Sequence, residues 1–215
     1  MKHAAAIASL ILALLFVASA VTATAQDYAG AYGGLGFSYG SGETEAIRVG
    51  AGPSSGNDPH AISGFSFGGF LGRNWQSGRS ILGVEAGLEV SDINGDDNFN
   101  DGVENGTRVL SFGHVSGRVG RVNDLGMLYA SLGVALADVR LTERAAVGGP
   151  ITGTNDVSHV GARLGLGAEF PLRTGRVRLE VSHSRFDRES GSYPGYVISS
   201  EPHVNQAGVY YVFGF

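Results

Sequence analysis

Apolar and polar positions alternate with a period of two through most of the chain after residue 26. In the segment 81–92, for example, apolar side chains occupy the even positions, while Gly83, Glu85, Gly87 and Glu89 lie between them. Successive residues of a strand point to opposite faces, so each such segment has one apolar and one polar face. The alternation predicts an all-β chain of eight strands. Their expected ranges are 28–39, 64–75, 81–92, 108–122, 126–140, 157–171, 176–188 and 204–213.

The connections between these segments alternate in length. Three are tight, at 76–79, 123–125 and 172–175. Four are long and polar, at 40–63, 93–107, 141–156 and 189–203. Short turns at one end and long loops at the other are typical of bacterial outer-membrane barrels, whereas a soluble sandwich has no such asymmetry. The pattern therefore predicts an eight-stranded antiparallel up-and-down transmembrane β-barrel, with short periplasmic turns and long extracellular loops.

The first 25 residues have the pattern of a secretory signal peptide. Lys2 supplies a basic start, residues 4–20 are almost wholly apolar, and the small residues Ala23-Thr24-Ala25 precede the expected cleavage before Gln26. The alternative is a membrane-anchoring helix, which needs about 20 apolar residues. Because this apolar core is shorter, we expect a signal peptide at 1–25 and a barrel domain at 26–215.

Composition narrows the possible chemistry. The chain has no Cys, which excludes thiol catalysis and thiolate metal sites. Its formal net charge of -5 makes nucleic acid an improbable partner, because no excess of cations is present to neutralise phosphates. Charged residues make up 16% of the chain and 35 residues are Gly, unlike an ordinary cytosolic enzyme. We expect neither a cofactor nor a metal.

Segment 92–104 offers carboxylate and amide oxygens of the kind that bind calcium. Gly95 stands at its fourth position, however, where an EF-hand loop requires glycine at the sixth, and Val103 replaces the twelfth-position Glu. The sequence favours a solvated, turn-rich loop and leaves calcium binding there open.

If the apolar faces meet lipid, the polar faces of all the strands share one interior. An interior enclosed by eight strands is just wide enough for side chains, so the charged residues there should form structural ion pairs that fill it. An ion path lined by the same charges is the alternative. The expected interior residues are Glu85, Glu89, Arg118, Arg163, Glu169, Arg178 and Glu180.

The C-terminal residues form a strand with aromatic side chains on one face, and the last residue is itself aromatic. This ending resembles the terminal-strand signal that the outer-membrane insertion machinery reads. The residues expected to carry it are Gly208, Tyr211, Phe213 and Phe215. An ordinary amphipathic edge strand is the alternative.

Several segments together resemble a known family. Residues 29–37, 68–76 and 82–93, followed by 115–120 and 128–135, are similar in order to strands of small alphaproteobacterial outer-membrane β-barrel proteins, the porin-like or opacity-type surface antigens. The resemblance covers residues 27–215. It implies a non-enzymatic outer-membrane protein with a role in envelope integrity, adhesion or surface antigenicity. It also implies as partners outer-membrane lipid and lipopolysaccharide, the insertion machinery, periplasmic chaperones, and a host or surface ligand for the long loops.

Two other functions were weighed against this one. The first is a small-solute porin-like channel. The second is a lipid-modifying enzyme, suggested by Ser182-His183-Ser184, since lipid A deacylases carry Ser and His on the outer wall. Adjacent strand residues point to opposite faces, and the His-x-Ser-Asn pattern of those enzymes is absent. We therefore expect no catalytic residues and interpret His183 as a wall or rim residue.

Overall fold

The computed structural model describes residues 27–50, 57–98, 104–144, 149–193 and 196–215. The predicted signal peptide and its cleavage site lie outside these ranges. No helix in the described part of the chain is long and apolar enough to cross a membrane. The described residues form nine strands: β1 (Gly30–Gly50), β2 (Asn57–Ser77), β3 (Ser80–Asn98), β4 (Glu104–Asn123), β5 (Gly126–Arg144), β6 (Ile151–Leu172), β7 (Gly175–Phe186), β8 (Glu189–Tyr193) and β9 (Tyr196–Gly214).

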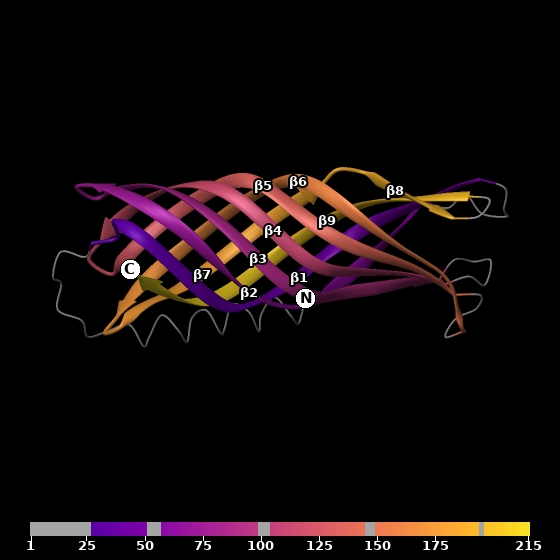
Figure 1. Ribbon diagram of the computed structural model, residues 1–215, viewed down its shortest axis with the longest axis horizontal. Coiled ribbons are helices and arrows are strands. Elements are labelled where there is room, and N and C mark those ends of the chain that lie inside the picture. The colour runs from indigo at the N-terminus through magenta and orange to yellow at the C-terminus, as the bar shows by residue number, and fades with distance from the viewer. Residues whose placement is uncertain (1–26, 51–56, 99–103, 145–148, 194–195) are drawn as a thin grey trace.

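The strands form one antiparallel sheet that closes on itself. Each strand from β1 to β7 pairs with its neighbour in the chain, β7 pairs with β9, and β9 pairs back with β1, for example at Leu35 and Tyr211. The short β8 pairs with β9 and continues the line of β7 beyond a break at residues 187–188. The wall is therefore eight strands around, which confirms the predicted antiparallel barrel (Figure 1).

The three predicted short turns are confirmed. Two-residue turns join β2 to β3, β4 to β5 and β6 to β7. In the first, Gly78 has a φ of 57°, which a residue without a side chain adopts at no steric cost. The C-terminus lies at this end of the barrel, and β8 lies at the opposite end (Figure 1).

The bounds predicted for the four long connections need correction, because the flanking strands extend into them. Residues 40–50, 57–63, 93–98, 104–107, 141–144, 151–156, 189–193 and 196–203 all belong to strands. At about 3.3 Å per residue, the 21 residues of β1 span about 70 Å, which is far more than the ~25 Å apolar band of such barrels requires even for a tilted strand. The predicted strand ends lie where the outward apolar residues stop, but the hydrogen-bonded ladder continues beyond that point.

The strands from β1 to β7 and β9 consequently have two parts, which we call the membrane section and the outer section, whereas the short β8 belongs to the outer section alone. In the membrane section the outward side chains are apolar and exposed, as at Leu128, Leu132 and Leu136 of β5. In the outer section the outward side chains are polar, as at Asp138 and Arg140 farther along the same strand. The boundary between the two sections marks the outer edge of the apolar belt.

Glycine makes room inside the barrel for aromatic rings. A Cβ atom placed at Gly167 would collide with the ring of Tyr129, and one placed at Gly34 would collide with the ring of Phe70. The rings therefore lie flat against the wall at these glycines, which gives a physical reason for inward-facing glycine in this chain.

Candidate functional site

The charged residues expected inside the barrel meet within the membrane section. Glu85, Arg118, Glu169 and Arg178 form its centre, although they come from four different strands. Arg118 lies 3.3 Å from a carboxylate oxygen of Glu85 and 2.9 Å from one of Glu169. Arg178 approaches the same two carboxylates at 2.8 and 2.9 Å. Two guanidinium groups thus alternate with two carboxylates around one centre.

This centre is removed from solvent. Arg118 and Arg178 are each 1% exposed, and Glu169 is fully buried. The guanidinium of Arg178 lies 3.8 Å from the centroid of the Phe70 ring, and that of Arg118 lies 4.4 Å from the centroid of Tyr129. Ring faces and carboxylates thus surround both cations, an environment suited to a planar guanidinium that keeps its charge when buried.

A second group of charges lies beside the first. Arg163 pairs with Glu180 at 2.7 Å, and Glu180 also accepts a hydrogen bond from the hydroxyl of Tyr129. Glu89 is bound differently, because its partners are neutral donors. It accepts hydrogen bonds from the hydroxyl of Tyr210 at 2.7 Å and from the side-chain amide of Gln206 at 3.1 Å. All seven predicted interior residues therefore belong to one connected set of contacts.

The structure adds participants that the sequence analysis did not name. Arg176 contacts Glu169 at 2.9 Å and is a third arginine beside that carboxylate. The hydroxyl of Tyr32 donates to Glu85, and the ring of His114 lies 3.5 Å from the same carboxylate. These residues, like Gln206 and Tyr210, occupy inward positions of the two-residue alternation. The same alternation identifies them, although neutral side chains and His carry no charge pattern that marks them as interior residues.

An aromatic and apolar layer closes the short-turn end of the interior. Tyr28, Ile81, Val122, Met127 and Tyr129 form one buried cluster. Tyr28 precedes β1: its backbone N–H donates to Oε1 of Gln76 at 2.8 Å, and the guanidinium of Arg176 lies 5.0 Å from the centroid of its ring. The segment just before the first strand therefore folds into the barrel mouth.

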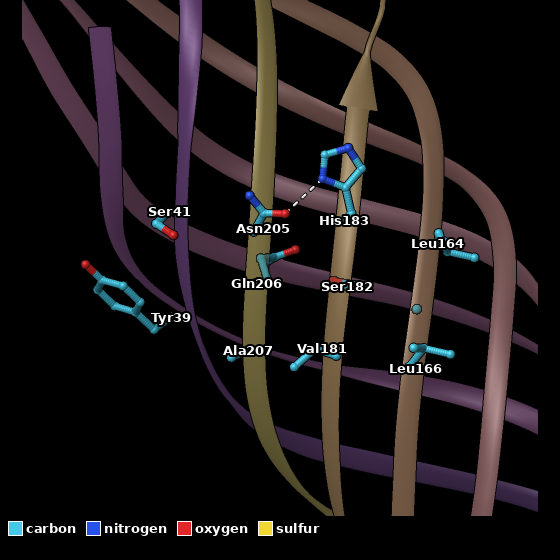
Figure 2. Close-up of a pocket in the computed structure, with 11 residues that line it drawn as sticks. Tyr39, Ser41, Leu164, Leu166, Val181, Ser182, His183, Asn205, Gln206 and Ala207 are labelled. Atoms are coloured by element: carbon cyan, nitrogen blue, oxygen red, sulfur yellow. Dashed lines mark hydrogen bonds between the residues drawn. The ribbon is translucent and has the colours of Figure 1, made fainter. Parts of the chain in front are cut away.

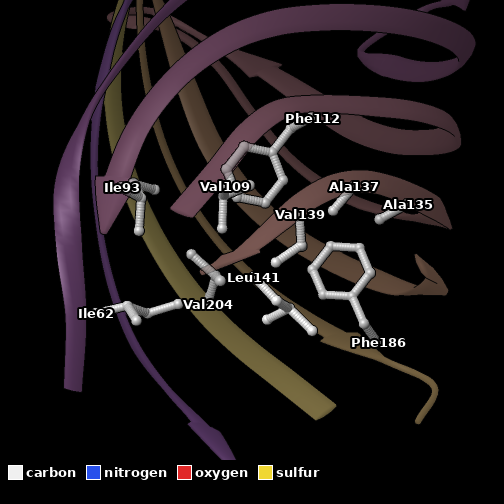
Figure 3. Packing of buried hydrophobic residues seen from close by; sticks show 10 residues of the cluster. All are labelled: Ile62, Ile93, Val109, Phe112, Ala135, Ala137, Val139, Leu141, Phe186 and Val204. Atoms are coloured by element: carbon white, nitrogen blue, oxygen red, sulfur yellow. The ribbon is translucent and has the colours of Figure 1, made fainter. Parts of the chain in front are cut away.

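The interior of the outer section is apolar, so the prediction that polar faces share one interior throughout is wrong there. Figure 3 shows Phe112, Val139 and Phe186 pointing toward one another from β4, β5 and β7. The cluster comprises Ile62, Ile93, Val109, Phe112, Ala135, Ala137, Val139, Leu141, Phe186 and Val204. Two buried histidines of this section have polar partners: His159 contacts Ser200 and His60 contacts Thr107, each at 3.1 Å. Because water surrounds this section, its apolar side chains turn inward.

The outward face of the outer section carries ion pairs. Arg140 binds both carboxylate oxygens of Asp156, at 2.7 and 2.8 Å. The hydrogen bond from Arg140 holds the pKa of Asp156 below its ordinary value. Arg185 and Arg188 both contact Glu201, and the hydrogen bond from Arg185 lowers the pKa of that carboxyl group in the same way. This surface has the composition expected of a protein in water.

The predicted C-terminal signal lies on the closing strand β9. Tyr211, Phe213 and Phe215 point outward at the short-turn end and are 41%, 37% and 73% exposed. Gly208 lies beneath the ring of Tyr210 on the same strand. Trp75 of β2 is also exposed at this end, so aromatic side chains occupy the periplasmic edge of the belt as such barrels require.

Two other candidate sites can now be placed. His183 points outward, whereas Ser182 and Ser184 are buried inside, so neither serine can meet its imidazole. In the segment 92–104, for which the sequence leaves calcium binding open and favours a solvated loop, residues 92–98 belong to β3, Glu104 begins β4, and residues 99–103 lie outside the described ranges. Within the described residues, no group of three His, Cys, Asp or Glu side chains is arranged to hold a metal.

Comparison with known proteins gives a matching family model, a relative of known sequence, and solved structures of similar fold. A family model described as "Outer membrane protein beta-barrel domain" matches residues 9–213. A "22 kDa outer membrane protein" of Rhizobium leguminosarum bv. viciae is 34% identical over 146 residues, which are 64% of this chain and 62% of that protein. The matched region is thus less than two thirds of the relative's length.

Among solved structures, the outer membrane protein OprG from Pseudomonas aeruginosa has a TM-score of 0.51 at 12% identity. That match covers 87% of this chain and 97% of OprG. The attachment invasion locus protein Ail of Yersinia pestis matches with a TM-score of 0.35 at 11% identity, over 86% of this chain and 99% of Ail. At these identities the likeness to OprG concerns the fold.

Proposed function

This chain belongs to the family of outer membrane protein beta-barrel domains, and from that premise we propose that it is a closed barrel that conducts no solute and serves envelope integrity and surface interaction. Its location is the outer membrane of a Gram-negative bacterium. The proposal concerns what the barrel does there.

The observation that carries this proposal is the filling of the interior at three levels. The cluster around Tyr28 and Met127 lies at the short-turn end, the ion-pair network lies in the middle, and the apolar cluster around Phe112 and Phe186 lies in the outer section. An ion crossing the barrel would have to pass two apolar layers, each of which offers it no substitute for its hydration shell. The charges in the middle then hold the wall together and fill the space.

The outer section supports the surface-interaction part of the proposal. Its strands carry a polar, ion-paired surface beyond the apolar belt, and its packed core gives that surface a fixed shape. A rigid platform reduces the entropy lost when a partner binds. The partner could be a host or environmental ligand, and the insertion machinery and periplasmic chaperones would act earlier, during assembly.

A porin-like channel is the competing function, since charged side chains do line the membrane section. Single-channel recording of the purified barrel in a planar bilayer separates the two. We expect no steady conductance from the wild-type protein or from Arg118→Ala. Stable conductance steps whose cation or anion preference changes in Arg118→Ala would replace our proposal with the channel.

An enzyme is the third candidate, because some proteins of similar fold are proteases or lipid hydrolases. A lipid-hydrolase dyad requires a nucleophile beside an outward histidine. The two serines that flank His183 point into the barrel. Release of fatty acid from lipopolysaccharide by the refolded protein, abolished in His183→Ala, would contradict the non-enzymatic role.

A further inference from the structure

A groove on the lipid-facing wall lies at the boundary between the two sections. It has a volume of about 360 Å³ and crosses β6, β7, β9 and β1. Figure 2 shows Tyr39 on one side, Leu164 and Leu166 on the other, and the short side chains of Val181 and Ala207 between them. Its volume is within the usual range for ligand pockets, roughly 300–1,000 Å³.

Polar groups line the outer end of this groove. His183, Asn205 and Ser41 lie opposite one another on adjacent strands, where the outward apolar residues of β7, β9 and β1 stop. Nδ1 of His183 lies 2.9 Å from Oδ1 of Asn205 (Figure 2). Beyond them a second hollow, of about 340 Å³, is lined by Ser41, Gly42, Glu43, His203 and Asn205. An apolar groove thus continues into a polar one.

The contact between His183 and Asn205 occupies one ring nitrogen of His183 and leaves the other, Nε2, available to a ligand. Since Oδ1 of Asn205 is an acceptor, Nδ1 of His183 carries the proton and donates it. Nε2 has no hydrogen-bond partner among the described residues, and in a neutral imidazole it accepts a hydrogen bond. A polar atom facing the edge of the hydrocarbon layer is costly unless it finds a partner there. A hydrogen-bond donor on a bound lipid would supply that partner.

We propose that this groove binds one acyl chain of lipopolysaccharide, with the chain against Leu164, Leu166 and Ala207 and a hydroxyl or amide group of its linkage donating to Nε2 of His183. Position supports this choice, because the groove lies at the outer edge of the belt, where lipopolysaccharide forms the leaflet. Chemistry supports it too. The amide-linked 3-hydroxyacyl chains of lipid A offer donors at that depth, whereas the ester linkages of a glycerophospholipid offer only acceptors.

Charges farther out are compatible with the same occupant. Arg185 and Arg188 lie above the groove on the outward face, with side chains 67% and 46% exposed. Arg185 pairs with Glu201, and Arg188 pairs with Glu201 and Glu45. A guanidinium has five N–H donors, so it can bind a phosphate oxygen in addition to a carboxylate. The inference rests on the proposed location of the barrel in the outer membrane, but not on whether the interior conducts.

The test is native mass spectrometry of the protein extracted in mild detergent from bacterial outer membranes. We expect the wild type to retain one lipopolysaccharide per barrel. Ala207→Phe fills the groove and should reduce the retained fraction at least ten-fold, and His183→Leu should reduce it as well. Ala86→Phe is the matched control, because Ala86 faces lipid on β3, away from the groove, and it should behave as wild type.

Equal retention in Ala207→Phe and Ala86→Phe would overturn the proposal, as would a retained molecule with the mass of a phospholipid. Heat-modifiable migration on gels checks that each variant is folded. Single-channel recording of the same preparations keeps the two proposals separate. A conducting wild type with groove-dependent retention would contradict the closed barrel alone, and a silent barrel without retention would contradict the lipid site alone.

Discussion

The membrane section and the outer section are built from the same strands and one continuous ladder, yet their faces are inverted. Along β5, Leu132 and Leu136 point outward near the short-turn end, while Val139 and Leu141 point inward farther along. On β5 itself the alternation of faces is unbroken and the residue types exchange places, while the neighbouring β4 shifts its register between Val109 and Ser111, opposite Val139 and Asp138. What changes is the surrounding medium, from lipid to water.

This difference separates two ways of stabilising a barrel. In the outer section, apolar side chains leave water when they turn inward, so the hydrophobic effect favours folding as it does in a soluble protein. In the membrane section lipid is as apolar as leucine, and turning apolar groups inward would gain little. The interior there is stabilised by ion pairs, hydrogen bonds and aromatic rings instead. The two sections should therefore respond differently to the same substitution.

The largest effect is expected from removing the membrane section of β9 while its outer section remains. Deleting residues 208–215 removes the partners of β1 from Tyr32 to Ser38 and leaves the sheet open in lipid. Unpaired backbone groups are not tolerated there, so no folded barrel should form. Heat-modifiable migration and protease resistance, with the full-length chain refolded in parallel, provide the measurement. A protease-resistant barrel from this truncation would show that the outer section alone can close the sheet.

The second largest loss of stability is expected from removing a charged side chain inside the membrane section. Arg118→Ala leaves Glu85 and Glu169 with one fewer cation, and Glu180→Ala leaves Arg163 without its carboxylate. Removing one partner of a buried pair costs about 3–5 kcal/mol. Each variant should therefore lower the urea midpoint of the refolded protein clearly. Unchanged midpoints in both would indicate a hydrated interior, in which the charges are solvated by water.

A leucine pair compares the two sections directly. Leu141 is buried in the outer section, and Leu141→Ala should cost about 2–5 kcal/mol, because it removes apolar contacts and leaves a cavity. Leu136 faces lipid and is 52% exposed, so Leu136→Ala should change the free energy of unfolding far less, since lipid fills the space. Urea unfolding in the same vesicles measures both. Similar losses would mean that the inversion of faces has no energetic consequence.

The smallest effect is expected at the outward ion pair of the outer section. The pKa of Asp156 is lowered by Arg140, so the pair stabilises the fold above the ordinary pKa of the carboxyl and loses this contribution as the pH falls through the lowered pKa. Water screens the pair, and Arg140→Gln should shift the midpoint at pH 7 by little more than experimental error. The difference from wild type should vanish in acid. A midpoint loss at pH 7 as large as that of Arg118→Ala would show that this surface is not solvated.

The number of strands around the barrel, their antiparallel order and the short-turn end were all predictable from local sequence patterns. This is because the alternation of Leu82 to Val90 and the tight turns at 76–79, 123–125 and 172–175 are local features. The seven interior charges were predictable as well, since the parity of a strand position fixes the face on which its side chain lies.

The height of the wall and the contacts between side chains depend on tertiary structure. The height of the wall could not be read from outward apolar residues, because the strands continue where that signal ends. The pairing of Arg118 with both Glu85 and Glu169, the neutral donors around Glu89 and the recruitment of Arg176 depend on register between distant strands. The row of His183, Asn205 and Ser41 exists for the same reason, because residues 22 and more positions apart become neighbours when the sheet closes. Closure is a property of the whole chain, and no local pattern encodes it.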